Sequence, residues 1–187
     1  MDREYPLSVT ITDSLQYLCI HKGNKMEWRI EVGYKPNATD SYGEGIKKDI
    51  EDLGISGVKD VKTMQIYMLF GDIDESDVEY ISKNLLTDSI TQYYEYKGSE
   101  HHKNDIGAWM IDVTYKPGVT DAVGDSTVKG IKDLGISGIK SAKTGKRFII
   151  KGELTEDDIA TICRRLLANE VIQNYDYYKI KSNDETA

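Results

Sequence analysis

Apolar and polar residues alternate over two short stretches of the chain, residues 28–34 and 109–115. The apolar members are Trp28, Ile30, Val32 and Tyr34 in the first stretch, and Trp109, Ile111, Val113 and Tyr115 in the second. A period of two predicts a strand with one buried face. A Lys-Pro pair follows each stretch and is expected to end the strand.

Apolar residues at helical spacing follow each predicted strand. They are Ile46, Ile50 and Leu53 in the first copy, and Val128, Ile131 and Leu134 in the second. Thr39–Asp40 and Thr120–Asp121 offer side-chain oxygens to the unpaired amides of a helix start. Gly54 and Gly135 are typical residues for the helix ends. The sequence therefore predicts one amphipathic helix after each strand.

A pair of strands is expected next, clearest in the second copy at Ile139–Lys143 and Lys146–Lys151. Thr144–Gly145 would supply the hairpin turn between them, whereas the first copy has a less clear turn. Residues 66–70 and 148–150 are continuously apolar, which predicts burial on both faces of a strand. One face would take the helices, and the other the partner repeat or another subunit.

A second helix and a last strand complete each copy. Thr155–Asp158 resembles a capping box, and Ile159, Ile162 and Leu166 form the apolar stripe that follows it. The last strands carry Tyr94 and Tyr96, or Tyr175 and Tyr177. The order strand, helix, strand, strand, helix, strand is that of a ferredoxin-like unit.

The chain is a tandem duplication, because residues 30–59 match residues 111–140 at an offset of 81 without a gap. From Ile30 to Tyr96, 28 of 67 aligned positions are identical. We expect an α+β fold of two tandem ferredoxin-like (β-α-β-β-α-β) units, with antiparallel sheets and helices on one face, that form an intramolecular pseudo-dimer. The predicted divisions are an N-terminal extension (1–25), repeat 1 (26–97), a polar linker (98–107), repeat 2 (108–180) and a tail (181–187).

The extension has two possible structures. Ser8–Thr12 fits a strand, and Leu15–Ile20 fits either a second strand or a short helix that begins after Asp13.

The net charge of −8 argues against a surface for duplex nucleic acid or anionic membranes. Residues 30–96 carry 6 Lys+Arg and 14 Asp+Glu, whereas residues 111–177 carry 10 of each. This difference indicates either drift on solvated faces or two repeats that face different partners. Cys163 is expected to be a buried free thiol, and the two cysteines favour a reducing compartment. With neither a signal peptide nor a membrane-length apolar run, the sequence predicts a soluble cytoplasmic protein.

Candidate catalytic chemistry is sparse. Neither of the two glycine-rich phosphate-binding motifs, G-x-x-x-x-G-K-[ST] and G-x-G-x-x-G, follows a predicted strand. His101–His102 and His21 lie outside both repeats, and Asp72, Asp74 and Asp157–Asp158 suit helix caps. We expect no catalytic residues, no cofactor and no metal. RNA binding through the tyrosines is disfavoured by the acidic first repeat, whereas tyrosine suits packing against another protein chain.

Basic residues next to predicted turns are the candidates for contacts with a partner subunit. Lys116, Lys146 and Arg147 hold these positions in the second copy, and Lys35 matches Lys116. With the two helix-start aspartates, the predicted interface residues are Lys116, Asp121, Lys146, Arg147, Lys35 and Asp40.

Four motifs of the second copy resemble the PurS family, the small subunit of phosphoribosylformylglycinamidine synthase (formylglycinamide ribonucleotide amidotransferase). They are K-x-G-V-x-D-x-x-G at Lys116–Gly124, L-G-I-x-G-I at Leu134–Ile139, the pair Gly145–Lys146, and L-L-A-N-x-V-I-x-x-Y at Leu166–Tyr175. The first copy keeps fewer of them, with Asn37 in place of Gly118.

The resemblance implies a non-catalytic subunit in de novo purine biosynthesis. Such a subunit bridges a glutaminase subunit and an ATP-dependent amidation subunit, and it assists the transfer of ammonia between them. This chain would be two such subunits fused, with possible self-association. The alternative is a tandem ACT-like regulatory domain that binds a small effector between its halves.

Overall fold

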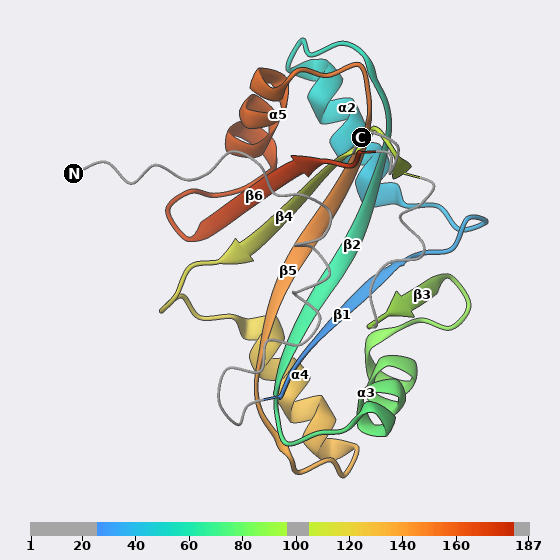
Figure 1. The fold of residues 1–187 in the computed structure, drawn as a ribbon, viewed down its shortest axis with the longest axis vertical. Coiled ribbons are helices and arrows are strands. Elements are labelled where there is room, and N and C mark those ends of the chain that lie inside the picture. The colour runs from blue at the N-terminus through green and yellow to red at the C-terminus, as the bar shows by residue number, and fades with distance from the viewer. Residues whose placement is uncertain (1–25, 97–104, 182–187) are drawn as a thin grey trace, which may run out of the picture.

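The computed structural model describes residues 26–96 and 105–181 (Figure 1). The interpretations of Ser8–Thr12 and Leu15–Ile20, the histidines His21 and His101–His102, and most of the predicted linker and tail lie outside these residues.

Each repeat contributes three strands and two helices to the part of the chain that the structure describes. Repeat 1 forms β1 (Met26–Tyr34), α2 (Ser41–Asp52), β2 (Val58–Gly71), α3 (Glu75–Ile81) with a π-helical turn η2 (Ser82–Leu86), and β3 (Gln92–Glu95). Repeat 2 forms β4 (Trp109–Tyr115), α4 (Ala122–Asp133), β5 (Ile139–Gly152), α5 (Glu156–Ile162) with η4 (Cys163–Leu167), and β6 (Gln173–Lys179).

The six strands of residues 26–96 and 105–181 belong to one sheet with the order β3-β1-β2-β5-β4-β6, and every pairing is antiparallel. The order reads the same from both edges when each strand of repeat 1 is matched with its counterpart in repeat 2. A pseudo-twofold axis therefore passes between β2 and β5, the two long strands that cross the middle of the molecule in Figure 1. This arrangement confirms the predicted intramolecular pseudo-dimer.

The predicted hairpin at Thr144–Gly145 is wrong, because both residues lie inside the 14-residue strand β5. Gly145 does not take the positive φ that a two-residue type I′ turn requires. Instead β5 pairs with β2 over nearly its whole length, from Gly152 opposite Val58 to Ile139 opposite Gly71. Strand hydrogen bonds to the other repeat thus replace those that a hairpin would make within one repeat.

Because β2 and β5 pair with each other instead of folding into hairpins, the first helix of each repeat packs against the other repeat. Helix α2 of repeat 1 packs in one core with α5, β4 and the second half of β5, all from repeat 2. Helix α4 of repeat 2 packs in the other core with α3 and β1 of repeat 1. Each core thus lies in a ferredoxin-like lobe with four strands and two helices, built from both repeats. Figure 1 shows α2 and α5 at one end of the molecule and α3 and α4 at the other.

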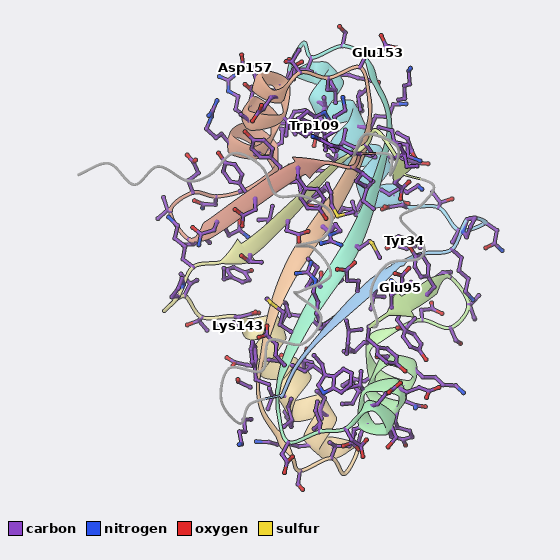
Figure 2. The ribbon with its side chains drawn as sticks, in the orientation of Figure 1. Tyr34, Glu95, Trp109, Lys143, Glu153 and Asp157 are labelled. Carbon is purple, nitrogen blue, oxygen red and sulfur yellow. The ribbon has the colours of Figure 1, made fainter. Side chains whose placement is uncertain are left out.

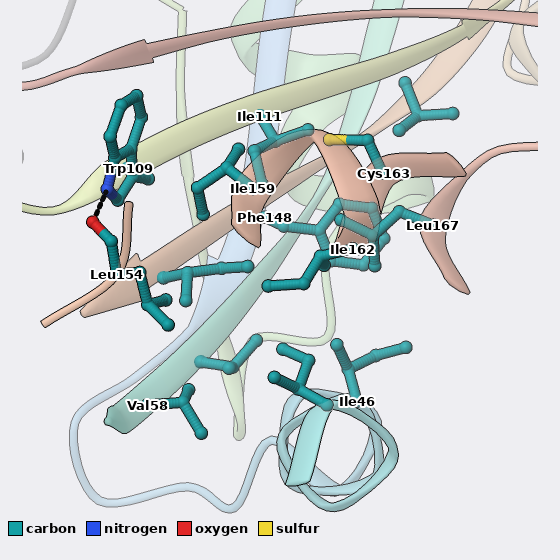
Figure 3. Packing of buried hydrophobic residues seen from close by; sticks show 14 residues of the cluster. Ile46, Val58, Trp109, Ile111, Phe148, Leu154, Ile159, Ile162, Cys163 and Leu167 are labelled. Atoms are coloured by element: carbon teal, nitrogen blue, oxygen red, sulfur yellow. Dashed lines mark hydrogen bonds between the residues drawn. The ribbon is translucent and has the colours of Figure 1, made fainter. Parts of the chain in front are cut away.

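Helices α2, α3, α4 and α5 cover the same face of the sheet, as predicted. The buried strand residues of the two cores, such as Ile30, Leu69, Ile111 and Phe148, alternate with those of the opposite face along the paired strands. Figure 3 shows the first core, in which the Trp109 indole N–H donates to the carbonyl of Leu154 at 3.3 Å.

The predicted helix boundaries are confirmed. The Asp40 and Asp121 side chains cap α2 and α4. Gly54 and Gly135 follow the helix ends with φ of 82° and 89°, a conformation that glycine adopts without strain. The capping box at Thr155–Asp158 is present.

Candidate functional site

The six predicted interface residues fall into three places. Lys35 and Asp40 lie between β1 and α2, and Lys116 and Asp121 hold the equivalent places between β4 and α4. Lys146 and Arg147 lie in the middle of β5 rather than beside a turn, so the reason first given for choosing them does not hold.

The aspartates fasten each connection to the nearest long strand. Asp121 accepts hydrogen bonds from the backbone N–H of Gly124 at 2.8 Å and of Thr144 at 2.5 Å, and from the Thr144 hydroxyl. Asp40 makes the same set of contacts with Gly43 and Thr63. One carboxylate therefore caps a helix and also satisfies a strand amide, which explains why both copies keep it.

The lysines hold a second loop in each repeat. The Lys35 ammonium donates to the carbonyl of Ser89 at 2.6 Å, and the Lys35 backbone N–H donates to that of Thr91 at 2.9 Å. Lys116 contacts the carbonyls of Glu170 and Ile172 in the same manner. We name these loops tip 1 (residues 88–92) and tip 2 (residues 169–173).

The two tips contain the same three internal hydrogen bonds at equivalent positions. In tip 1 the Asp88 carboxylate accepts from the N–H of Ile90 at 2.8 Å, which lowers the pKa of Asp88. The Gln92 side chain accepts from the N–H of Asp88 at 2.9 Å, while the N–H of Gln92 donates to the carbonyl of Asp88 at 2.8 Å. Asn169, Val171 and Gln173 repeat all three contacts in tip 2. The same internal hydrogen bonds therefore fix the conformation of both loops.

Each tip presents an aliphatic side chain to solvent. Ile90 and Val171 are both 81% exposed, and they are equivalent positions of the two repeats. Tyr34 and Tyr115 end β1 and β4 beside the tips and are also exposed. Figure 2 shows Tyr34 and Glu95 at the edge of the sheet formed by β1 and β3. Tip 2 lies at the opposite edge, next to β6.

Arg147 binds carboxylates of two other strands of the sheet. It donates to Asp112 through Nε at 2.7 Å and Nη2 at 2.8 Å, and to Glu31 through Nη1 at 2.8 Å. Arg29 closes the ring with bonds of 2.8 Å to the same two carboxylates. Burial alone would lower the pKa of Arg147, but its bonds to Asp112 and the charge of Glu31 raise that pKa. This ring joins the repeats on the sheet face opposite the helices.

Lys146 lies on the helix-bearing face, where its ammonium stands 4.1 Å from the centre of the Tyr42 ring of α2. The Tyr42 ring in turn lies 6.2 Å from that of Phe148. Lys146 therefore makes a cation–π contact across the boundary between the repeats. Whether any of the six residues touches a partner subunit stays a prediction.

Sequence reasoning missed Asp105, which the prediction left in a polar linker. Its carboxylate is buried and binds the ammonium groups of Lys62 at 3.2 Å and Lys151 at 2.7 Å. These lysines lie on β2 and β5, so Asp105 ties the start of repeat 2 to both long strands. The acidic ring partners Glu31 and Asp112 were also missed, although their matched places in the repeats were a usable signal.

A small cavity lies beside the β4–α4 connection. This cavity, lined by Met68, Lys143 and the β4–α4 connection, has a volume of about 60 Å³, far below the several hundred Å³ typical of ligand pockets. In residues 26–96 and 105–181, no three His, Cys, Asp or Glu side chains are grouped to hold a metal ion. No helix among them is long and apolar enough to span a membrane.

The chain is similar to known proteins in both repeats. The family model described as PurS, phosphoribosylformylglycinamidine (FGAM) synthase, matches residues 27–100 and again residues 109–181. The PurS subunit of this synthase from Archaeoglobus fulgidus is 40% identical over 70 residues, which cover 35% of this chain and 88% of that protein. The Synechocystis sp. subunit is 36% identical over 70 residues, which cover 35% and 70%.

One similar solved structure is that of Methanocaldococcus jannaschii PurS, described as a subunit of formylglycinamide ribonucleotide amidotransferase in the purine biosynthetic pathway. It is 22% identical, covers 40% of this chain and 96% of its own, and gives a TM-score of 0.33.

Proposed function

Because this chain belongs to the PurS family, whose model matches it twice, we propose that it is the PurS subunit of a phosphoribosylformylglycinamidine synthase complex in purine biosynthesis. In that role it bridges a glutaminase subunit and an ATP-dependent amidation subunit in the cytoplasm. It has no catalytic residue of its own, and it assists ammonia transfer by holding the two active sites together.

The observation that carries the bridging role is the single sheet. A bridge needs two separate contact surfaces at a fixed distance. The β2–β5 ladder makes the two repeats one continuous sheet, and equivalent loops lie at its opposite edges. Two PurS-like repeats in one chain thus provide two attachment points without any association between chains.

The different charges of the repeats support different partners for the two halves. Residues 30–96 have a net charge of −8 and residues 111–177 a net charge of zero, although both share one backbone frame. Charge complementarity selects partners and sets association rates. We therefore expect charge reversals confined to repeat 1 to weaken the binding of one subunit more than that of the other. Equal weakening of the same subunit by reversals in either repeat would refute this assignment.

Reconstitution tests the function as a whole. The chain is combined with the glutaminase and amidation subunits of the same organism, and product is assayed with glutamine or with ammonium as nitrogen source. We expect the glutamine reaction to require the chain, whereas the ammonium reaction largely does not. Glutaminase alone and amidation subunit alone are the controls.

A complex that neither forms in gel filtration nor changes either reaction would contradict the proposal. The effector-binding alternative would then need a ligand that raises the melting temperature by mass action. The cavity of about 60 Å³ gives that alternative no support.

A further inference from the structure

The tips place aliphatic side chains where turn chemistry does not favour them. Gly, Asn, Asp and Ser are the residues that tight turns prefer, yet Ile90 and Val171 occupy matching places and are 81% exposed. Fewer than half of the aligned positions of the repeats are identical. The two copies have therefore changed the residue and kept a large, solvated, β-branched side chain.

The side chains of Ile90 and Val171 do not hold the tips together. The bonds that fix the loops use backbone groups of these two residues and side chains of their neighbours. The Lys35 and Lys116 ammonium groups anchor the loops from the β1–α2 and β4–α4 connections. A side chain presented on a fixed loop loses little conformational freedom on binding, which favours its use as an anchor.

One other exposed apolar pair, Tyr34 and Tyr115, holds equivalent positions, but each is only 36% exposed. The remaining exposed apolar residues do not match in this way. Tyr80 on α3 is 51% exposed, but its counterpart in repeat 2 is Thr161. Tyr42 and Val123 are both exposed, but they differ in shape, and the Tyr42 ring already receives the Lys146 ammonium. The tips are where strong exposure and aliphatic shape recur together.

We propose that Ile90 and Val171 are the apolar anchors of the bridge, each entering an apolar pocket on a partner subunit. This inference rests on the proposed function and names its contact surfaces. The lysine beside each tip keeps ammonium donors beyond the one given to the loop carbonyl, so the pocket should carry a hydrogen-bond acceptor at its rim. Because the tips lie at opposite edges of the sheet, each engages a separate partner molecule.

The test measures binding of the full chain to the purified glutaminase and amidation subunits by isothermal titration calorimetry. The variants are Ile90→Asp and Val171→Asp, with Ile90→Ala and Val171→Ala as milder changes. We expect each Asp variant to weaken the binding of at least one partner subunit on the order of tenfold or more, as for a buried anchor. Tyr80→Thr and the exchange Ile90→Val with Val171→Ile are matched controls that should bind as the wild type does.

Unchanged melting temperatures would show that the variants fold, as expected for solvated side chains. Folded Asp variants that bind both partners normally would overturn the anchors while leaving the proposed function intact. A wild-type chain that binds neither partner would refute the proposed function, and the anchors with it. Variants that alter only the self-association of the chain in sedimentation would assign the tips to a second copy instead.

Discussion

Gln65 of β2 lies directly opposite Lys146 of β5, and the two residues occupy the same position in the two repeats. The pseudo-twofold axis passes through this pair, so Met64 faces Arg147 on one side of it and Ile66 faces Gly145 on the other. Two identical copies of one repeat could therefore pair with each other through the same strand register. In this chain the paired residues of the two repeats differ, and the Gln65 side chain donates to the carbonyl of Gly145 at 2.8 Å.

This symmetry predicts that neither repeat folds as a monomer. Without repeat 1, the core around Phe148 loses Ile46, Ile50, Val58 and Val61, and β5 loses its pairing with β2. Fragments 1–104 and 105–187 are therefore expected to be unfolded or concentration-dependent dimers when separate, and to form the native sheet when mixed. Circular dichroism and sedimentation at several concentrations measure this. A fragment that unfolds cooperatively as a monomer would contradict it.

The sequence predicted the positions of the helices and strands better than it predicted which strands pair. Alternation in β1 and β4, the caps Asp40 and Asp121, and the stops at Gly54 and Gly135 depend on neighbouring residues, and all are found where expected. The hairpin failed because Thr-Gly is compatible with a turn and with a strand. Pairing with a strand about 80 positions away decided the outcome, and no local pattern encodes it.

The close approach of α2 to β2 predicts opposite effects for two glycines of one helix. A Cβ on Gly43 would lie 2.4 Å from the carbonyl oxygen of Val61, whereas a Cβ on Gly45 would meet nothing within 4 Å. Gly43→Ala should therefore destabilise the protein by about 2 kcal/mol or more, because backbone must move. Gly45→Ala should stabilise it by about 0.5–1 kcal/mol through helix propensity. Urea denaturation of both variants checks this, and equal effects would contradict it.

The ion ring predicts unequal costs for its two arginines. The Arg147 side chain is 10% exposed and makes three bonds, whereas that of Arg29 is 31% exposed and makes two. Replacing each by the residue of the other repeat gives Arg147→Ile and Arg29→Met. Removing Arg147 leaves two carboxylates undercompensated and should cost about 3 kcal/mol.

Arg29→Met is the matched control, and we expect a loss closer to about 1 kcal/mol from this more solvated pair. The free energy of unfolding from urea titrations at low and high salt measures both changes. Because the Arg147 contacts are buried, their loss should change little with salt. An Arg147 variant as stable as the Arg29 variant would contradict the unequal costs expected for the two arginines.

The ring also shows what sequence reasoning lacked at the candidate site. Lys35 and Lys116 were chosen because they sit beside turns, and they do hold the tips. Arg147 was chosen for the same reason, but it lies within β5, and its partners Glu31 and Asp112 come from strands on either side of the β2–β5 pair.

Cys163 predicts a loss of stability at alkaline pH. The side chain is fully buried in the first core (Figure 3), and burial raises the pKa of its thiol from 9.0 to about 12. The folded chain therefore keeps a proton that the unfolded chain releases above about pH 9, so the free energy of unfolding falls as pH rises. Between pH 8 and pH 10 this thiol should lower the free energy of unfolding by an amount on the order of 1 kcal/mol. Urea titrations of the wild type and of Cys163→Ala at each pH measure the difference. Parallel pH curves would contradict the prediction, as would rapid reaction of Cys163 with a thiol reagent in a folded Cys19→Ser chain.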